Sequence, residues 1–292
     1  MKSISSNKII CFLLISVLMF STFTVNAFAF DNSINAQPSI LKKVDKKSIE
    51  VVSKELALLD NVGFDANNIM ALNKNSDGSF TYTYKLAGNI IGEATLIEEA
   101  LDFITIEFVE GECHDALTIF DDGTLYLDGN KIIFSEIETN RDYLTDEQLK
   151  YFELIQNETS FSYYTSPPFG TKSSDYTLEV TTHKSPNNSI GKAIQAISVA
   201  ALAVIIGAAL KIKLPGSINT TILSIIASSL KSKAENVNPN SAFFSYKMKE
   251  TQAPAFKTTW ETFIKYSGQF YTEKDYGGGE TSSTMYCYKT LL

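Results

Sequence analysis

The pattern of apolar and polar residues in the first half of the chain predicts a helix followed by antiparallel strands. Apolar residues at helical spacing predict a helix over residues 47–59. They are Ile49, Val52, Leu56 and Leu59. From position 80 onward large side chains alternate with Thr and Lys, which places them on one face of a strand. They are Phe80, Tyr82, Tyr84 and Leu86.

Further short strands are predicted over residues 90–134. They are separated by segments rich in Asn, Asp and Gly, residues that accept the positive φ of tight hairpin turns at little cost. These turn segments are 75–78, 87–89, 121–123 and 128–130. Short strands joined in sequence by such turns form an antiparallel meander. The N-terminal part is therefore predicted to be a helix plus a β meander.

The centre of the chain is an apolar block over residues 190–210, in which Lys192 is the single charge. As one helix this block would be about 30 Å long, close to the thickness of the hydrocarbon core of a bilayer. A turn at Pro215-Gly216 and a second helix ending near residue 233 predict a helical hairpin. A helix that is apolar on all sides is typical either of a protein core or of a membrane element, and both alternatives remain open.

The candidate membrane hairpin combines two stripes of side chains. Small residues on the first helix would let another helix approach closely, and apolar residues on the second helix form a stripe beside an uncharged face of Ser and Thr. The candidate residues are Ala196, Ala200, Ala203, Gly207, Pro215, Gly216, Ile222 and Ile226.

After residue 234 the alternating pattern returns and predicts antiparallel strands to the C-terminus. The predicted fold class is α+β. The predicted organisation has five segments: a signal peptide (1–29), an N-terminal helix and β meander (30–140), a connector with a short helix and a strand (141–188), the apolar helical hairpin (189–234) and a C-terminal antiparallel β region (235–292).

The N-terminus has the three parts of a secretory signal peptide. Lys2 and Lys8 give a positive start, residues 9–20 are apolar, and small residues precede possible cleavage sites after Ala27 and Ala29. We therefore predict a secreted, extracellular protein. The abundance of Lys, Asn and Ile and the single arginine, Arg141, indicate a low-GC Gram-positive source.

The charge balance argues against nucleic acid as a partner. The chain has 25 basic and 33 acidic residues, a net charge of −8, and removal of residues 1–29 with their two lysines makes it −10. Binding the phosphate backbone needs clustered Lys and Arg. A membrane remains compatible, because local patches matter more there than net charge.

Two cysteines remain after the predicted cleavage, Cys113 and Cys287. In an exported protein they are a candidate disulfide, and two buried thiols are the alternative. The sequence contains no recognisable catalytic motif. The two histidines, His114 and His183, lack the companions of a zinc site. Asp121, Asp122 and Asp128 are explained by turn formation. No cofactor and no metal are predicted.

Residues 190–292 resemble the geobacillin-type secreted proteins of Firmicutes. The resemblance rests on the apolar block 193–210, on Pro215-Gly216 and on the aromatic run 243–288. It implies a heat-labile, bacteriocin-like antibacterial protein that is not an enzyme, and the sequence does not identify an immunity protein as its partner. From the sequence we therefore expect action at a bacterial membrane or envelope receptor, with the hairpin as the membrane-active element. The alternatives are a non-enzymatic extracellular binding or structural module with a buried hairpin and, third, an extracellular hydrolase.

Overall fold

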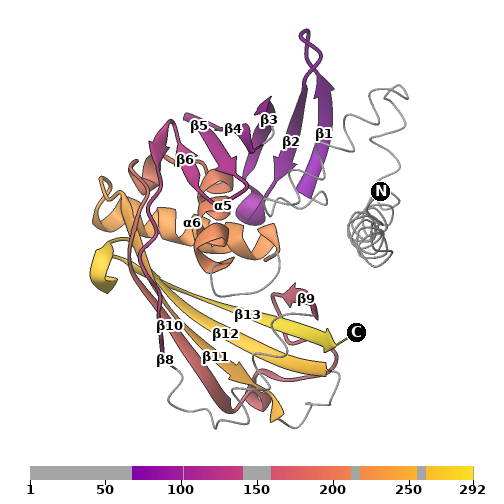
Figure 1. Ribbon diagram of the computed structural model, residues 1–292, viewed down its shortest axis with the longest axis vertical. Coiled ribbons are helices and arrows are strands. Elements are labelled where there is room, and N and C mark those ends of the chain that lie inside the picture. Colours follow the sequence, from indigo (N-terminus) through magenta and orange to yellow (C-terminus); the bar gives the residue numbers. More distant parts are fainter. Residues whose placement is uncertain (1–67, 101, 141–158, 212–217, 255–260, 292) are drawn as a thin grey trace, which may run out of the picture. The chain divides into compact units, whose positions relative to one another are not determined.

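The computed structural model describes residues 68–100, 102–140, 159–211, 218–254 and 261–291. All of them belong to one compact unit, Leu58–Leu292, and they form two antiparallel sheets and two α-helices (Figure 1). Four predicted features lie outside the described residues. They are the signal peptide (1–29), the N-terminal helix (47–59), the short helix of the connector (within 141–158) and the turn at Pro215-Gly216.

The first sheet, called sheet A, is a seven-stranded meander in which each strand pairs with the next one along the chain. The Asn, Asp and Gly turns separate its strands as the sequence predicted. The large residues of β2 are all buried, and they alternate with partly exposed threonines, so one face of the sheet is apolar. The strands are β1 (Ile69–Lys74), β2 (Phe80–Lys85), β3 (Ile91–Glu99), β4 (Phe103–Glu110), β5 (Cys113–Phe120), β6 (Leu125–Leu127) and β7 (Asn130–Lys131).

The second sheet, called sheet B, has six antiparallel strands in the order β8-β10-β11-β12-β13-β9. Its long strands β10 to β13 curve together below the helices in Figure 1. Two strands from the predicted connector, β9 and β10, are therefore part of the same sheet as the C-terminal strands. The strands are β8 (Glu138–Asn140), β9 (Thr159–Tyr164), β10 (Leu178–Ser189), β11 (Phe243–Gln252), β12 (Glu261–Tyr271) and β13 (Glu280–Leu291).

The predicted α+β class is wrong. Strands make up 49% of the described residues, and the only α-helices among them are α5 (Val199–Lys211) and α6 (Thr220–Val237). Before α5 the described chain forms strands and 3-10 turns alone. The protein is therefore mainly β, with two helices packed against strands of the sheets.

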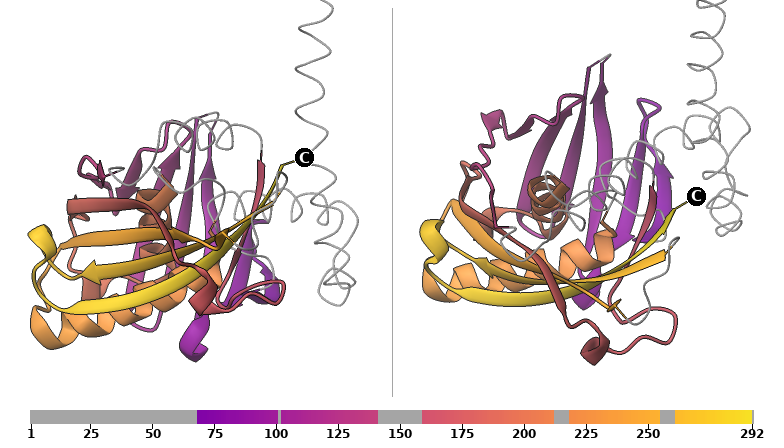
Figure 2. Two further views of the ribbon diagram at one scale, coloured as in Figure 1. Left: turned by 90° about the horizontal axis from the view of Figure 1, so that it is seen from below. Right: turned by 60° about the horizontal axis from the view of Figure 1, so that its bottom comes forward.

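The predicted helical hairpin is also wrong. The two helices contact each other. In the right-hand view of Figure 2, α5 is seen nearly along its axis, whereas α6 runs across the picture. The helices therefore cross steeply and do not lie antiparallel. The first helix is shorter than predicted, because residues 190–198 are held by other parts of the chain. The amide of Ile190 donates to the carbonyl of Ala242 at 2.9 Å, and that of Ile194 donates to the carbonyl of Ser241 at 2.8 Å.

Helix α5 therefore serves as core. Its 13 residues span about 20 Å at 1.5 Å per residue, and none of the described helices is both long and apolar enough to cross a membrane. Nearly every side chain of the helix is buried, as expected for a helix of the protein core, which was one of the two alternatives for an apolar helix. The hydroxyl of Tyr246 in β11 donates to the carbonyl of Ala209 at 3.2 Å, so α5 packs on sheet B.

Sheet B has two faces of different character. Tyr246 points to the helices, and its neighbour Lys247 points to the opposite side because side chains alternate along a strand. We call the side of Tyr246 the inner face and the side of Lys247 the outer face. Strand register carries this assignment across the sheet: Lys247 pairs with Gln269, and Lys265 of the same strand pairs with Tyr286. These residues therefore all belong to the outer face.

Candidate binding site

An aromatic cluster on the outer face of sheet B is the strongest candidate for a binding site. Three of its rings, Tyr176, Phe263 and Tyr286, are buried together with Ala253, and the partly buried Tyr288 packs against them. Tyr164 of β9 packs against them, and Phe169 lies on top. We call these six residues the Phe169 surface: Tyr164, Phe169, Tyr176, Phe263, Tyr286 and Tyr288.

Strand register explains why these aromatic residues meet. Phe263 lies opposite Tyr288 across the β12–β13 pair, and Tyr286 lies opposite Tyr164 across the β13–β9 pair. Opposite residues of antiparallel strands share a face with Cβ atoms about 5 Å apart. The Phe263 and Tyr288 ring centroids are 5.1 Å apart, and those of Tyr176 and Tyr286 are 5.3 Å apart.

Phe169 is the exposed member of this surface. Its ring lies 4.6 Å from that of Tyr288, 6.0 Å from that of Tyr164 and 6.2 Å from that of Phe263. Even with three aromatic neighbours, 65% of the residue remains exposed. A large apolar side chain that stands above other rings and still faces solvent is typical of an interaction site, in which an aromatic residue acts as the anchor.

The backbone at Phe169 is strained. Phe169 has a φ of 52° and Gly170 a φ of 77°, the pattern of a type I′ turn, whose central positions favour Asn, Asp and Gly. The turn is closed by the amide of Thr171, which donates to the carbonyl of Pro168 at 3.1 Å. The Thr171 hydroxyl donates to the same carbonyl at 2.7 Å. Such strain gathers at functional sites, where it positions a side chain for its task.

Polar groups border the Phe169 surface. The Tyr288 hydroxyl donates to the Glu261 carboxylate at 2.5 Å, and this hydrogen bond raises the pKa of Tyr288. Lys265 donates to the hydroxyl of Ser173 at 3.0 Å. The carboxylate of Asp175 accepts from the amide of Lys172 at 2.6 Å. Apolar rings surrounded by a few placed donors and acceptors are the usual composition of a ligand site.

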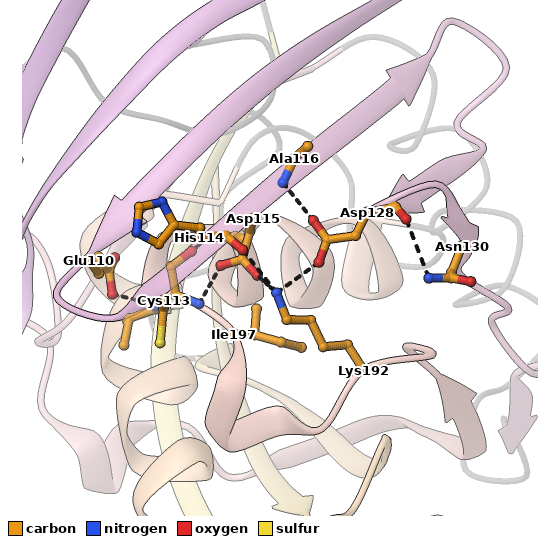
Figure 3. A network of polar contacts seen from close by, with 12 residues as sticks. Glu110, Cys113, His114, Asp115, Ala116, Asp128, Asn130, Lys192 and Ile197 are labelled. Atoms are coloured by element: carbon orange, nitrogen blue, oxygen red, sulfur yellow. Dashed lines mark hydrogen bonds and ion pairs between the residues drawn. The ribbon is translucent and has the colours of Figure 1, made fainter.

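A second polar group of residues anchors the start of α5 on sheet A (Figure 3). The carboxylate of Asp115 accepts from the amide of Ser198 at 2.6 Å. That of Glu110 accepts from the amides of Val199 at 2.6 Å and Ala200 at 2.9 Å. These are the amides that a helix leaves without an internal partner, and negative charge is favoured there by the helix dipole. We call Glu110, Asp115 and the two lysines described next, Lys192 and Lys231, the α5 clasp.

Two lysines complete the α5 clasp. Lys192 reaches Asp115 at 2.6 Å and Asp128 at 2.7 Å, as Figure 3 shows. Burial favours the neutral amine, but the hydrogen bonds to the two carboxylates raise the pKa of Lys192. Lys231 of α6 donates to the carbonyl of Ile197 at 2.6 Å and to the thiol of Cys113 at 3.2 Å. Each of these charged groups has a hydrogen-bond or ion-pair partner within the protein. The role of the clasp is therefore to hold α5 in place.

Gly92 is required for the clasp to form. The Tyr84 hydroxyl donates to Glu110 at 2.8 Å, and a Cβ atom at Gly92 would lie 2.5 Å from that hydroxyl and 2.7 Å from Cγ of Glu110. Burial and the Glu110 carboxylate raise the pKa of Tyr84. A glycine at this point of β3 lets both side chains cross it to reach the helix.

A third polar group lies on the inner face of sheet B. Tyr163, Glu250, Tyr266, Cys287 and Lys289 are buried there. Burial lowers the pKa of Lys289 to about 8 and raises that of Cys287 to about 12. Burial also raises the pKa values of Tyr163 and Tyr266. Burial therefore shifts Lys289, Cys287, Tyr163 and Tyr266 toward their uncharged forms.

The structure separates the residues predicted for the membrane hairpin. Ala196 ends a 3-10 turn, η4 (Ile194–Ala196), and Ala200, Ala203 and Gly207 lie on α5. Ile222 and Ile226 are buried on α6. Gly207 does allow a close helix approach, because a Cβ atom there would lie 2.8 Å from Cδ1 of Leu223. The small-residue stripe therefore serves the contact between α5 and α6.

The predicted disulfide is wrong as well, because Cys113 and Cys287 are both free thiols. Cys113 lies on β5 of sheet A beside Lys231, whereas Cys287 is buried on β13 of sheet B. The two cysteines do not pair because their strands belong to different sheets. The sequence gives no information on which sheet each strand joins. Among the described residues no group of three or more His, Cys, Asp or Glu side chains could hold a metal ion.

Sequence reasoning missed the Phe169 surface. From the sequence, the Pro and Gly residues of the segment 166–170 indicate a break and a candidate linker. The available signal was a phenylalanine beside glycine in that turn, at a place where a polar residue is usual. The chain matches no family model, no curated protein and no solved structure. The geometry of the site alone therefore supports the proposal below.

Proposed function

We propose that this is an exported, non-enzymatic protein that acts at a bacterial cell envelope by binding an envelope component through the Phe169 surface. The observation that carries the proposal is Phe169 itself, which is 65% exposed and held above three rings by a turn with positive φ. Its proposed role is bacteriocin-like antagonism, as the resemblance of residues 190–292 implies. Helix α5 is buried and contributes the core, so binding replaces membrane insertion in this proposal.

The proposal is tested by replacing Phe169. Purified secreted protein is incubated with washed envelopes of related Gram-positive bacteria, and the bound fraction is measured by sedimentation. Phe169→Ala should weaken binding about tenfold or more, because an aromatic anchor at the centre of an interface commonly contributes this much. Growth inhibition of the same bacteria should fall with it.

The matched control is Phe120→Ala in sheet A. Phe120 is also partly exposed, and its ring contacts those of Phe103 at 5.2 Å and Tyr126 at 5.6 Å. This variant should bind envelopes like the unaltered protein. A second variant, Phe169→Asn, removes the ring but suits positive φ, which separates loss of contact from loss of fold. Equal binding by Phe169→Ala and the unaltered protein would refute the proposal.

A further inference from the structure

A second aromatic group lies at the far end of the outer face of sheet B. Tyr271 ends β12, and Tyr276 ends the 3-10 turn η6 (Lys274–Tyr276) that follows it. Their rings meet edge to face with centroids 5.8 Å apart. The Lys247 ammonium lies 4.2 Å from the Tyr276 ring and 5.6 Å from the Tyr271 ring. We call these three residues the Tyr276 group.

Tyr276 shares its unusual backbone with Phe169. Asp275 and Tyr276 have φ values of 56° and 63°. The hydroxyl of Ser245 accepts from the Tyr276 amide at 2.9 Å and donates to the carbonyl of Glu273 at 2.7 Å. A bulky residue rarely adopts this conformation. The same face of one sheet therefore holds, at its two ends, a large aromatic residue fixed in the left-handed region.

The surface between the two aromatic groups is polar and balanced in charge. Phe263 and Tyr271 are eight residues apart on β12, which is roughly 26 Å at 3.3 Å per residue. Gln269, which is exposed, and Ser267 lie between them on the outer face. The positively charged residues on this face are Lys184, Lys247, Lys249 and Lys265, and the negatively charged ones are Glu138, Glu179, Glu261 and Glu280.

We propose that the Phe169 surface and the Tyr276 group are two subsites of one extended site for a linear cell-wall glycan. This inference rests on the proposed function and names the ligand class. The apolar C–H face of a sugar ring suits the negative face of an aromatic ring, and amide, hydroxyl and ammonium groups between the subsites suit sugar hydroxyls. The separation of the subsites requires an oligosaccharide longer than one or two rings.

Charge distinguishes this ligand from its competitors. A polyanion needs a surface with excess Lys and Arg, and on this face four lysines are balanced by four glutamates. An anionic membrane attracts a basic amphipathic surface with a large apolar area. This protein has a net charge of −8, and among its described residues Phe169 is the single strongly exposed aromatic residue on this face. A neutral glycan matches both observations.

The inference is tested with Tyr276→Ala and with uncharged linear strands of β-linked N-acetylglucosamine, because strands released from wall by removal of the peptides carry a carboxylate on every second sugar. Strands of graded length are used to compete with envelope binding. Long strands should compete, and disaccharide fragments should compete at least tenfold less well, because one molecule must reach both subsites. Tyr276→Ala should lose most of this length dependence. Tyr126→Ala on sheet A, the matched control, should retain it.

The outcomes separate this inference from the proposed function. If envelopes bind and Phe169→Ala fails to bind, but strands do not compete and Tyr276→Ala behaves normally, the glycan inference is overturned while the function stands. Competition by the peptide fraction, or binding to phosphatidylglycerol vesicles, would overturn it in the same way. Absence of all envelope binding would refute the function itself. Tyr276→Asn, which suits positive φ, must give the same result as Tyr276→Ala, and a difference in binding between the two overturns the subsite.

Discussion

Burial at single residues of sheet B has consequences that can be measured. The Cys287 thiol and the Lys289 amine lie on the same inner face, and burial moves both toward their neutral forms. Because one group is an acid and the other a base, their effects on stability have opposite signs. The two shifted pKa values therefore predict how the free energy of unfolding should depend on pH.

We predict that stability rises between pH 8 and pH 9 and that this rise stops at higher pH. The native pKa of Lys289 is about 8, against an ordinary value of 10.5, so between these values the unfolded state binds more protons and stability increases with pH. The native pKa of Cys287 is about 12, against an ordinary 9.0. Above pH 9 the native state therefore binds more protons at Cys287, and the falling contribution of this thiol offsets the rising contribution of Lys289 up to about pH 10.5.

Urea unfolding midpoints from pH 8 to pH 10.5 measure these two effects. Cys287→Ala should extend the rise above pH 9, because the opposing thiol is gone. Lys289→Met should remove the rise altogether. Both variants are compared with the unaltered protein at each pH, so their constant costs cancel. Parallel profiles for all three proteins would contradict the prediction.

At the scale of the element, α5 shows how an apolar sequence is used when its helix is short. Ten of its 13 residues are buried, and its start is set by Glu110 and Asp115. The crossing with α6 depends on Gly207, whose missing side chain leaves room for Leu223. This makes Gly207 the position at which the helix contact can be tested.

Gly207→Ala should lower the free energy of unfolding by about 1–3 kcal/mol, the usual cost of overpacking a core. In an isolated helix the same change would stabilise by about 0.5–1 kcal/mol, so the sign of the effect reports the contact. Chemical unfolding followed by circular dichroism measures it. Combining the change with Leu223→Ala should cost less than the sum of the two single changes. Additive effects would show that the residues do not touch.

At the scale of the whole molecule, the α5 clasp joins sheet A to the helices. Asp115 is fully buried at its side chain, whereas Asp128 is 35% exposed there, although both bind Lys192. The neighbouring segments are also linked by an antiparallel bridge between Ile133 and Ser189. The clasp should therefore contribute to the cooperativity of the described unit.

Asp115→Asn should lower the free energy of unfolding by roughly 2 kcal/mol, because it weakens a buried charge pair and the binding of the first α5 amides. Asp128→Asn, the matched control, keeps a side chain that tolerates positive φ and removes an exposed charge, so its cost should stay below about 1 kcal/mol. Thermal unfolding of both variants provides the comparison. Equal costs would mean that Lys192 binds both carboxylates alike.

The alternation of side chains and the turn residues were sufficient to predict much of sheet A and the strands of the C-terminal part. Alternation of residues such as Tyr82 and Tyr84, and turns at Gly123 and Gly129, depend on neighbours in sequence. The apolar character of residues 199–210 likewise predicted a buried or membrane helix. The signal peptide and the secreted location remain predictions from the sequence.

The tertiary structure alone decided the fold class, the start of α5 and the candidate site. Residues 190–198 have an apolar sequence but lie outside the helix, because Ala242, Ser241 and Asp115 hold their amides. Cys113 and Cys287 are apart because their strands joined different sheets. The Phe169 surface forms because β9, β12 and β13 pair in one register. Each of these contacts joins segments far apart in the chain, and periodicity within a single segment carries no information about them.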